Sequence, residues 1–434
     1  MKDQKKLYSA IGKSMLGRYS VYAINLISMM VLARLFTPEL FGTVASIMVF
    51  FAFFQLIAEA GLGPAIINLD ALEPKDRDGL FGLTLVFGAV MALVFYFMAP
   101  LFKSFYKLPR VDEVVPYVAA ALFFFAASII PNALLLREQA FFRIANAGLA
   151  SELGSTILTI ILFQFIDPLH SLAAKGTLSA AISFSTLYYF SQNTEFRRPR
   201  YGTKFSAIKP LLSFSAYQFG FNFINYFARN LDNILIGRYL GPESLGIYDK
   251  AYQLMRYPLM LLTFAMTPAI QPVIRKHSDN KEMVEVIHRN FTFKLSVIGA
   301  VAGFGIFLLA EKIVIFMLGA QWVDVIPIVK VLAIAIPVQV VLSTSGSFFQ
   351  AMNRTDLLFL SGLLSSIIMV AAIVWGVLQR DMVKLSWALV AALHINFFQA
   401  YYIMYSRVFG KKLFQFLYRM VPASLIILTM LTWY

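Results

Sequence analysis

Long, predominantly apolar runs recur along the chain, and they constrain its fold more than any other feature. Each exceeds the roughly 18 residues that mark a membrane-spanning helix. In lipid, the backbone polar groups of such a run must be satisfied within the segment, so it crosses as a helix. The sequence therefore predicts an all-α, polytopic membrane protein. Four clear examples are Leu80–Phe102, Val114–Leu136, Phe291–Leu309 and Leu357–Leu378.

The composition excludes a soluble domain. Of the 434 residues, 59% are hydrophobic and only 14% are charged, and the mean hydropathy is +0.72. A soluble domain of this length needs far more charge to cover its surface. Cysteine is absent, which excludes disulfides, thiolate metal sites and thiol catalysis. The first apolar run is long and lacks a small-residue cleavage site, so we expect no cleavable signal peptide.

Hydropathy divides the chain into twelve predicted spans and one ambiguous C-terminal stretch. That stretch either begins near residue 420 and is too short to cross, or begins earlier, near Leu413. The charged segment 275–290 contains scattered apolar residues, which suits a short helix at the membrane surface. The twelve predicted spans cover residues 15–33, 42–67, 80–101, 114–136, 147–166, 170–190, 211–236, 246–272, 291–317, 325–350, 357–378 and 385–405.

The basic residues predict the orientation of these spans. With the N-terminus placed in the cytoplasm, 23 Lys and Arg residues fall in cytoplasmic loops and 8 in the opposite loops. This asymmetry is the positive-inside pattern. It accounts for the net charge of +14 without a nucleic-acid partner. The cluster formed by Arg197, Arg198 and Arg200 is better explained as a lipid-headgroup anchor than as an RNA contact.

A ten-residue passage occurs twice. Residues 33–42 read Ala-Arg-Leu-Phe-Thr-Pro-Glu-Leu-Phe-Gly, and residues 237–246 read Gly-Arg-Tyr-Leu-Gly-Pro-Glu-Ser-Leu-Gly. The shared Arg, Pro, Glu and Gly lie 204 residues apart without a gap. Pro and Gly bracket a short turn, and Glu39 can pair with Arg34 at the start of the following helix. We interpret the passage as a structural hairpin, not as a substrate contact.

The repeat predicts two fused halves. Six predicted spans separate the two copies, so both halves cross the membrane in the same direction. We expect 12 or more transmembrane helices, most of them in two six-helix bundles related by a pseudo-two-fold axis along the membrane normal, as in secondary transporters. The predicted division is an N-terminal bundle (1–190), a cytoplasmic linker (191–210), a C-terminal bundle (211–405), and a cytoplasmic loop with the ambiguous last helix (406–434).

Polar residues at three- and four-residue spacing lie on one face of the span 211–236, and the matching face of the first span is also polar. Exposing them to lipid is costly, so they must face protein or water. We favour a water-filled cavity over helix–helix hydrogen bonds for the whole stripe. The candidate binding residues are Arg18, Asn25, Asn222, Asn225, Arg229, Gln253 and Arg256. For Glu59, Glu152 and Lys175, elsewhere in the spans, internal packing is an equally good interpretation.

Enzyme motifs are missing. Gly12-Lys13 and Gly410-Lys411 lack the upstream glycine of a phosphate-binding loop. The four histidines show no metal-ligand spacing, and no loop is large enough to hold a catalytic domain. We therefore expect no enzymatic activity, no cofactor and no metal site. Transport, if it is the function, is not powered directly by ATP in this chain.

Two passages resemble a known family. Leu32–Gly42 followed by Phe54–Ile67 looks like the opening of bacterial polysaccharide flippases of the Wzx type. These form the polysaccharide-transporter branch of the multidrug/oligosaccharidyl-lipid/polysaccharide exporter superfamily. Ile236–Tyr248 is similar to the same family. In helix number and repeat order the resemblance covers nearly the whole chain, whereas only these passages are motif-like.

The resemblance implies a flippase that moves undecaprenyl-pyrophosphate-linked oligosaccharide across the bacterial inner membrane by alternating access, for O-antigen, capsule or exopolysaccharide. It implies that Arg18, Arg229 and Arg256 offset the charge of the pyrophosphate. It also makes Glu59 and Asp232 candidates for ion coupling. The expected partners are this lipid-linked oligosaccharide and membrane lipids, with polysaccharide polymerase and chain-length proteins as further candidates.

Two other function classes stay open. A multidrug exporter of the same superfamily would share the fold, but such exporters favour acidic cavity residues for cationic drugs, whereas the cavity predicted here contains several arginines. A membrane glycosyltransferase or polysaccharide polymerase would have a large external loop. The longest external loop predicted here, residues 101–113, is short.

Overall fold

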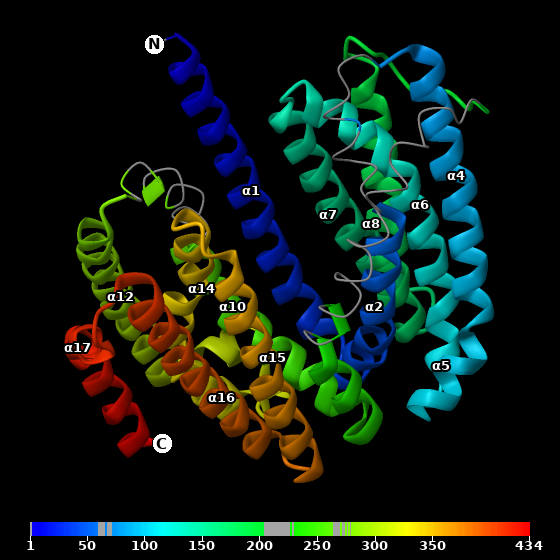
Figure 1. Ribbon diagram of the computed structural model, residues 1–434. Helices are drawn as coiled ribbons and strands as arrows, with labels where there is room; N and C mark the ends of the chain where they lie inside the picture. The colour runs from blue at the N-terminus through cyan, green and yellow to red at the C-terminus, as the bar shows by residue number, and fades with distance from the viewer. Residues whose placement is uncertain are drawn as a thin grey trace. The chain divides into compact units, whose positions relative to one another are not determined.

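The computed structural model describes residues 2–59, 72–203, 230–263 and 279–434, together with residues 66, 226, 227, 270, 274, 275 and 277. In this part of the chain the regular structure is helical throughout (Figure 1). Eight of the helices are long and apolar enough to cross a membrane, or nine spans if one bent pair counts as a span. The prediction of an all-α, polytopic membrane protein is confirmed.

The chain forms two compact units, Met1–Gly246 and Ile247–Tyr434. The predicted bundle boundaries at residues 190 and 211 stay predictions, because residues 204–225 lie outside the described part of the chain. The helices of the first unit are α1 (Lys2–Leu35), α2 (Pro38–Glu59), α4 (Pro74–Phe97), α5 (Ala99–Tyr106), α6 (Val111–Arg137), α7 (Phe141–Phe163) and α8 (Pro168–Ser191). The described residues 230–239 are also helical.

Helix α6 forms the centre of the first unit. It packs against α4 and α8, α8 packs against α7, and α7 packs against α1 (Figure 1). In its most apolar window 67% of the residues are buried, against 17–56% in the other seven spans. Its sequence Ala-Ala-Ala-Leu-Phe-Phe-Phe-Ala-Ala is apolar on all sides. A helix that is hydrophobic all round belongs inside a bundle.

Both copies of the repeated passage form helix–turn–helix junctions. In the first, α1 ends at Leu35 and α2 begins at Pro38, where the fixed φ of proline suits the first helical position. The buried Phe36 packs in the turn, with its ring centroid 5.2 Å from that of Phe163. In the second, helical residues 230–239 precede α10 (Gly241–Thr263), and Gly241 has a φ of +89°. This supports the interpretation of the passage as a hairpin.

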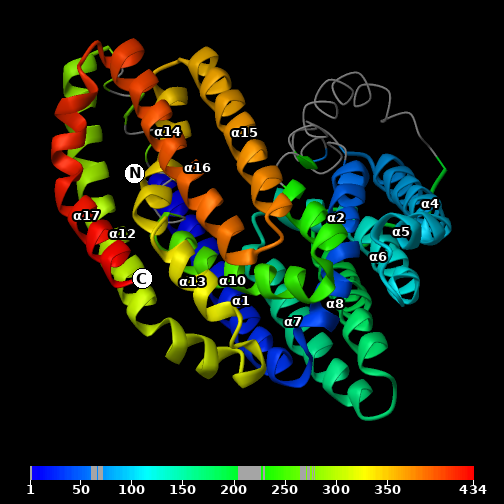
Figure 2. The same cartoon turned by 90° about the horizontal axis from the view of Figure 1, so that it is seen from below.

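The second unit contains most of α10 and all later helices. Helix α12 packs against α14 and α17, and α15 packs against α16 (Figure 2). The later elements are α12 (Lys281–Met317), the 3-10 turn η2 (Ala320–Trp322), α13 (Val325–Ala333), α14 (Ile336–Ala351), α15 (Thr355–Leu378), α16 (Met382–Ile403), the π-helical turn η3 (Met404–Phe409) and α17 (Leu413–Trp433).

The segment 275–290 is predicted to form a short helix at the membrane surface, but most of it belongs to the long helix α12. The prediction for 275–290 is wrong from Lys281 onward, because these residues begin the continuous 37-residue helix α12. Its N-cap Asn280 accepts a 2.9 Å hydrogen bond from the Met283 amide. Val284 and His288 are buried there. Packing on one side explains why this segment is amphipathic, and the partner is protein.

His288 lies in an aromatic enclosure within the second unit. Its Nδ1 atom is 3.1 Å from the hydroxyl oxygen of Tyr405. Ring centroids of five aromatic side chains lie 4.6–5.7 Å from the imidazole: Phe348, Tyr401, Tyr405, Phe409 and Phe416. The residue is therefore part of the hydrophobic core and not of a metal site.

Two further expectations change at the C-terminal end. The predicted span 325–350 is not straight, because α13 and α14 meet at an angle of 58°. Pro337, in the first turn of α14, cannot donate a backbone hydrogen bond across the break. The ambiguous last helix begins at Leu413, so α17 has 21 residues and is long enough to cross.

Candidate binding site within the membrane-spanning helices

Polar side chains from three apolar helices meet inside the first unit. The Lys175 Nζ atom lies 2.9 Å from Oε1 of Glu152. The hydroxyl of Thr156 donates to that of Ser28 over 3.0 Å, and the hydroxyls of Ser151 and Ser179 are 2.9 Å apart. We call these residues the polar cluster; it consists of Ser28, Ser151, Glu152, Thr156, Lys175 and Ser179.

Small residues bring α1 close to α7. A Cβ at Gly17 would lie 2.6 Å from that of Ala145, and one at Gly148 would lie 3.2 Å from Val21. Such contacts are typical of helix pairs in membranes, where small residues allow close approach. The residue numbers of the contacts rise together, so the two helices run parallel. Asn25, half-buried, therefore lies at about the level of Glu152.

The predicted polar stripe of the first span thus faces protein along part of its length. Val21 contacts α7, and Ser28 is buried against it. For these positions, helix–helix packing is the better interpretation, and the predicted water-filled cavity does not include them. The side chain of Arg18 lies outside the described residues.

The Glu152–Lys175 pair supplies the two charged side chains of the polar cluster. Glu152 is the central residue of α7, and the side chains of Glu152 and Lys175 are 14% and 23% exposed. Charged groups at such depth are expensive and mark functional positions by default. Sequence reasoning identified both residues but not their pairing, because helical periodicity gives only the face on which each lies.

Helix α10 brings a second group of polar residues together. The buried Lys250 ammonium lies 3.0 Å from Oδ2 of Asp249 and 3.3 Å from Oε1 of Gln253. The predicted binding residue Gln253 therefore accepts a hydrogen bond from its own helix. Arg256 is exposed, with its guanidinium 5.9 Å from the ring centroid of Tyr252. Lys250 falls within the predicted span 246–272, and the observed helix α10 begins nine residues before it, at Gly241.

The other predicted site residues are less well defined. Asn222, Asn225 and Arg229 lie outside the described residues. Asp232 is half-buried, and its Oδ1 atom accepts a 2.8 Å hydrogen bond from the Asn233 amide. Glu59 is exposed at the last residue of α2. The gathering of Arg18, Arg229 and Arg256 in one cavity stays a prediction.

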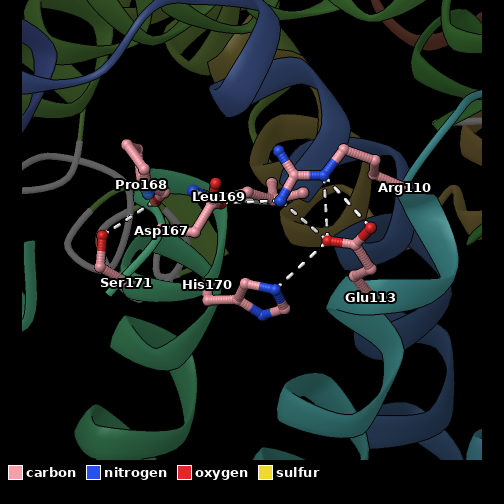
Figure 3. Close-up of polar contacts among 7 residues, drawn as sticks. All are labelled: Arg110, Glu113, Asp167, Pro168, Leu169, His170 and Ser171. Atoms are coloured by element: carbon pink, nitrogen blue, oxygen red, sulfur yellow. Dashed lines mark hydrogen bonds and ion pairs between the residues drawn. The ribbon is translucent and has the colours of Figure 1, made fainter. Parts of the chain in front are cut away.

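A separate charged cluster joins the start of α6 to the start of α8 (Figure 3). Arg110 lies 2.8 Å from Asp167 and 2.9 Å from Glu113, and Nε2 of His170 lies 3.2 Å from Glu113. The hydrogen bond from Arg110 lowers the pKa of Asp167, and the one to Glu113 raises the pKa of Arg110. Asp167 also caps α8 by accepting from the Leu169 amide over 2.9 Å.

This charged cluster links the starts of α6 and α8 at the surface, where its contribution to stability is small. Its side chains are 33–42% exposed, and exposed ion pairs contribute little each. The sequence signals for it were the three-residue spacing of Arg110 and Glu113 and the Asp-Pro pair at 167–168. Among the described residues, no group of three or more His, Asp or Glu side chains could hold a metal ion.

The family model described as "Polysaccharide biosynthesis protein" matches residues 31–327. The teichuronic acid biosynthesis protein TuaB of Bacillus subtilis is 25% identical over 312 residues, or 71% of this chain. The chain spans 63% of the length of TuaB. The lipopolysaccharide biosynthesis protein WzxC of Escherichia coli is 24% identical over 96% of this chain and 84% of its own length.

The fold is that of a solved transporter. The lipid II flippase MurJ, in an inward closed conformation, superimposes with a TM-score of 0.71 and 13% sequence identity. The match covers 96% of this chain and 97% of MurJ. At this identity the similarity extends to the fold alone.

Proposed function

This chain belongs to the family of polysaccharide biosynthesis proteins, and from that premise we propose that it is a lipid-linked oligosaccharide flippase. Its substrate is an oligosaccharide attached to undecaprenyl pyrophosphate, which it moves across the bacterial inner membrane by alternating access. The product serves O-antigen, capsule or exopolysaccharide synthesis. The proposal includes no enzymatic step.

The observation that carries this proposal is the extent of the family match. Residues 31–327 include both copies of the repeated passage and the helices α7 and α8 of the polar cluster. Charged and hydroxyl side chains inside otherwise apolar helices suit a substrate with an anionic headgroup and sugar hydroxyls. Phosphate oxygens accept charge-assisted hydrogen bonds from Arg and Lys.

The residue assignments extend the proposal. Arg18, Arg229 and Arg256 bind the pyrophosphate, because Arg stays charged when partly desolvated and can contact phosphate oxygens at two points. Asn25 and Gln253, with Asn222 and Asn225, hydrogen-bond the sugars. Glu59 and Asp232 are the candidates for ion coupling.

The cellular context belongs to the same proposal. The N-terminus faces the cytoplasm, and two six-helix bundles, 1–190 and 211–405, are related by an axis along the membrane normal. Polysaccharide polymerase and chain-length proteins act on the product at the outer face. The basic asymmetry of the loops supports this orientation.

The proposed function is tested by deleting this gene and measuring the lipid-linked oligosaccharides and the surface polysaccharide of the resulting strain. We expect the lipid-linked oligosaccharide to accumulate in the cytoplasmic leaflet and surface polysaccharide to be lost, with both restored by the parent gene. A multidrug exporter would instead give drug sensitivity with a normal oligosaccharide profile. A glycosyltransferase or polymerase would give a shortened or unpolymerised glycan.

The arginine assignments are tested by complementation of the same strain. The triple change of Arg18, Arg229 and Arg256 to Ala should abolish surface polysaccharide at an unchanged protein level in the membrane fraction. The matched control is Lys103→Met, which removes a cation from an exposed ion pair with Asp112. Full activity of the triple variant would show that these arginines do not bind substrate.

A further inference from the structure

Burying the charges of the Glu152–Lys175 ion pair costs desolvation free energy that an apolar contact between the same helices would not. Replacing a buried ion pair by well-packed apolar residues is often neutral or stabilising, so fold stability alone gives no reason for two charges here. Near this depth neither helix carries another Asp, Glu, Lys or Arg. Ser151 and Ser179 lie beside the pair and hydrogen-bond to each other at 2.9 Å.

The neighbouring helices offer no alternative charged partner. Helix α1 has no Asp, Glu, Lys or Arg between residues 19 and 33, α2 has none between 40 and 58, and α6 has none between 114 and 136. The titratable side chains on these helices near the pair's level are Tyr22 of α1 and Tyr117 of α6. The Tyr117 carbonyl accepts a hydrogen bond from Thr177, two residues beyond Lys175. Within the described helices packed on it, Lys175 therefore depends on Glu152 for charge balance.

The pair nevertheless has an open side. With 23% of its side chain exposed, Lys175 is more accessible than Glu152 at 14%. A lysine has a flexible stem and three donors, so its ammonium can change partners without backbone movement. The Lys175 ammonium is thus a cation that is neutralised by the Glu152 carboxylate and can exchange it for another anion.

Resting on the flippase function proposed above, we propose that Lys175 binds the anionic phosphate headgroup of the transported lipid and that Glu152 is its resident counter-ion. In the empty site the carboxylate pairs with the ammonium and offsets its desolvation. When the headgroup arrives, phosphate oxygens replace Oε1 of Glu152 around Nζ.

The exchange selects for charge. An anionic headgroup competes with the carboxylate for the ammonium, whereas a neutral polyprenol gains nothing from displacing it. A cationic ligand would need Glu152 itself and would leave Lys175 unpaired. Lys175 is thus a specificity-determining residue for phosphate-bearing lipids.

The test measures binding of two lipid probes to the purified full chain in nanodiscs: a polyprenyl pyrophosphate and the corresponding polyprenol. Lys175→Met should lose about tenfold in affinity for the pyrophosphate and nothing for the polyprenol. Lys175→Arg should keep the preference. Glu152→Gln should bind the pyrophosphate more tightly than the parent and turn over more slowly, because the competing anion has gone.

A neutral double variant keeps the test independent of folding. Glu152→Gln with Lys175→Met leaves no unpaired charge, so it should unfold at about the temperature of the parent yet bind the pyrophosphate as weakly as Lys175→Met. Parent-like binding by the double variant would make the pair merely structural. An unchanged affinity of Glu152→Gln would overturn the counter-ion role. Lys103→Met, in an exposed ion pair, is the matched control for loss of a lysine.

Failure here is distinguishable from failure of the proposed function. If the parent does not complement the deletion strain and binds both lipids equally, the flippase function itself is wrong. If the parent complements and prefers the pyrophosphate, but the double variant does so equally, only the role of Lys175 and Glu152 is rejected.

Discussion

Gly42 and Gly246, which occupy the same position in the two copies of the repeated passage, lie in reciprocal contact. A Cβ added to Gly42 would overlap the Pro242 carbonyl and lie 2.8 Å from the Gly246 nitrogen. A Cβ added to Gly246 would overlap the Pro38 carbonyl and lie 3.1 Å from the Gly42 nitrogen. Only glycine allows backbones to approach this closely. The repeat thus encodes a contact between its own two copies.

This contact predicts that neither glycine tolerates a methyl group. Gly42→Ala and Gly246→Ala should each destabilise the protein by about 1–3 kcal/mol, because the added Cβ overlaps backbone that has little room to shift. The measurement is the thermal unfolding midpoint of the purified protein in detergent. Gly176→Ala in α8 is the matched control, since a Cβ there has nothing within 4 Å. Equal midpoints for all three variants would contradict the close approach.

The hydrogen bond between Thr156 and Ser28 predicts a measurable coupling between α7 and α1. In a double-mutant cycle with Thr156→Val and Ser28→Ala, the interaction energy should be about 0.6 kcal/mol, the average for such bonds in membranes. The readout is unfolding in mixed micelles. Thr186→Val is the control, because its hydroxyl bonds the Ile182 carbonyl of its own helix. Coupling of Ser28 to Thr186 as large as to Thr156 would argue against a specific contact.

The lowered pKa of Asp167 predicts how the α6–α8 connection responds to acid. A carboxylate whose folded pKa lies below its unfolded value, about 3.9, stabilises the fold above that value. This contribution is lost as pH falls through the folded pKa. Comparing Asp167→Asn with its parent, we expect a constant difference in unfolding midpoint from pH 8 to pH 5, and a shrinking one below about pH 4.

The comparison is made in a His170→Gln background, which removes the imidazole that lies 3.2 Å from Glu113. Because Asp167 is 42% exposed, the difference should be small and should decrease with added salt. A difference that grows as the pH falls would have the wrong sign for a stabilising carboxylate.

The basic asymmetry of the loops predicts which segments face the cytoplasm. Since the parent has no cysteine, single-cysteine variants report accessibility without background. An impermeant maleimide applied to cells with a permeabilised outer membrane should label Ser104→Cys in α5 but not Asn193→Cys after α8; both positions are exposed. After disruption of the inner membrane both should react. The reverse pattern in intact cells would invert the topology.

Much of the fold is determined by local sequence. The apolar run Val114–Leu136 predicts α6 to within a few residues, and the Pro38 and Gly42 pattern marks the junction of α1 and α2. Burial of apolar surface and the need to satisfy every backbone group in lipid act on each segment separately, so hydropathy finds them. The bend between α13 and α14 also has a local cause in Pro337. Hydropathy alone does not reveal this bend, because both helices are apolar and give one continuous predicted span.

Only the tertiary structure decided which polar groups meet. The sequence placed Glu152 and Lys175 on two helices, yet it could not pair them with each other. Partner choice depends on how closely two helices approach and at what register. The distance and register are set by small residues such as Gly17 and Gly148. The sequence alone does not show which helix such a residue contacts. Periodicity therefore determined the faces, and packing determined the pairs.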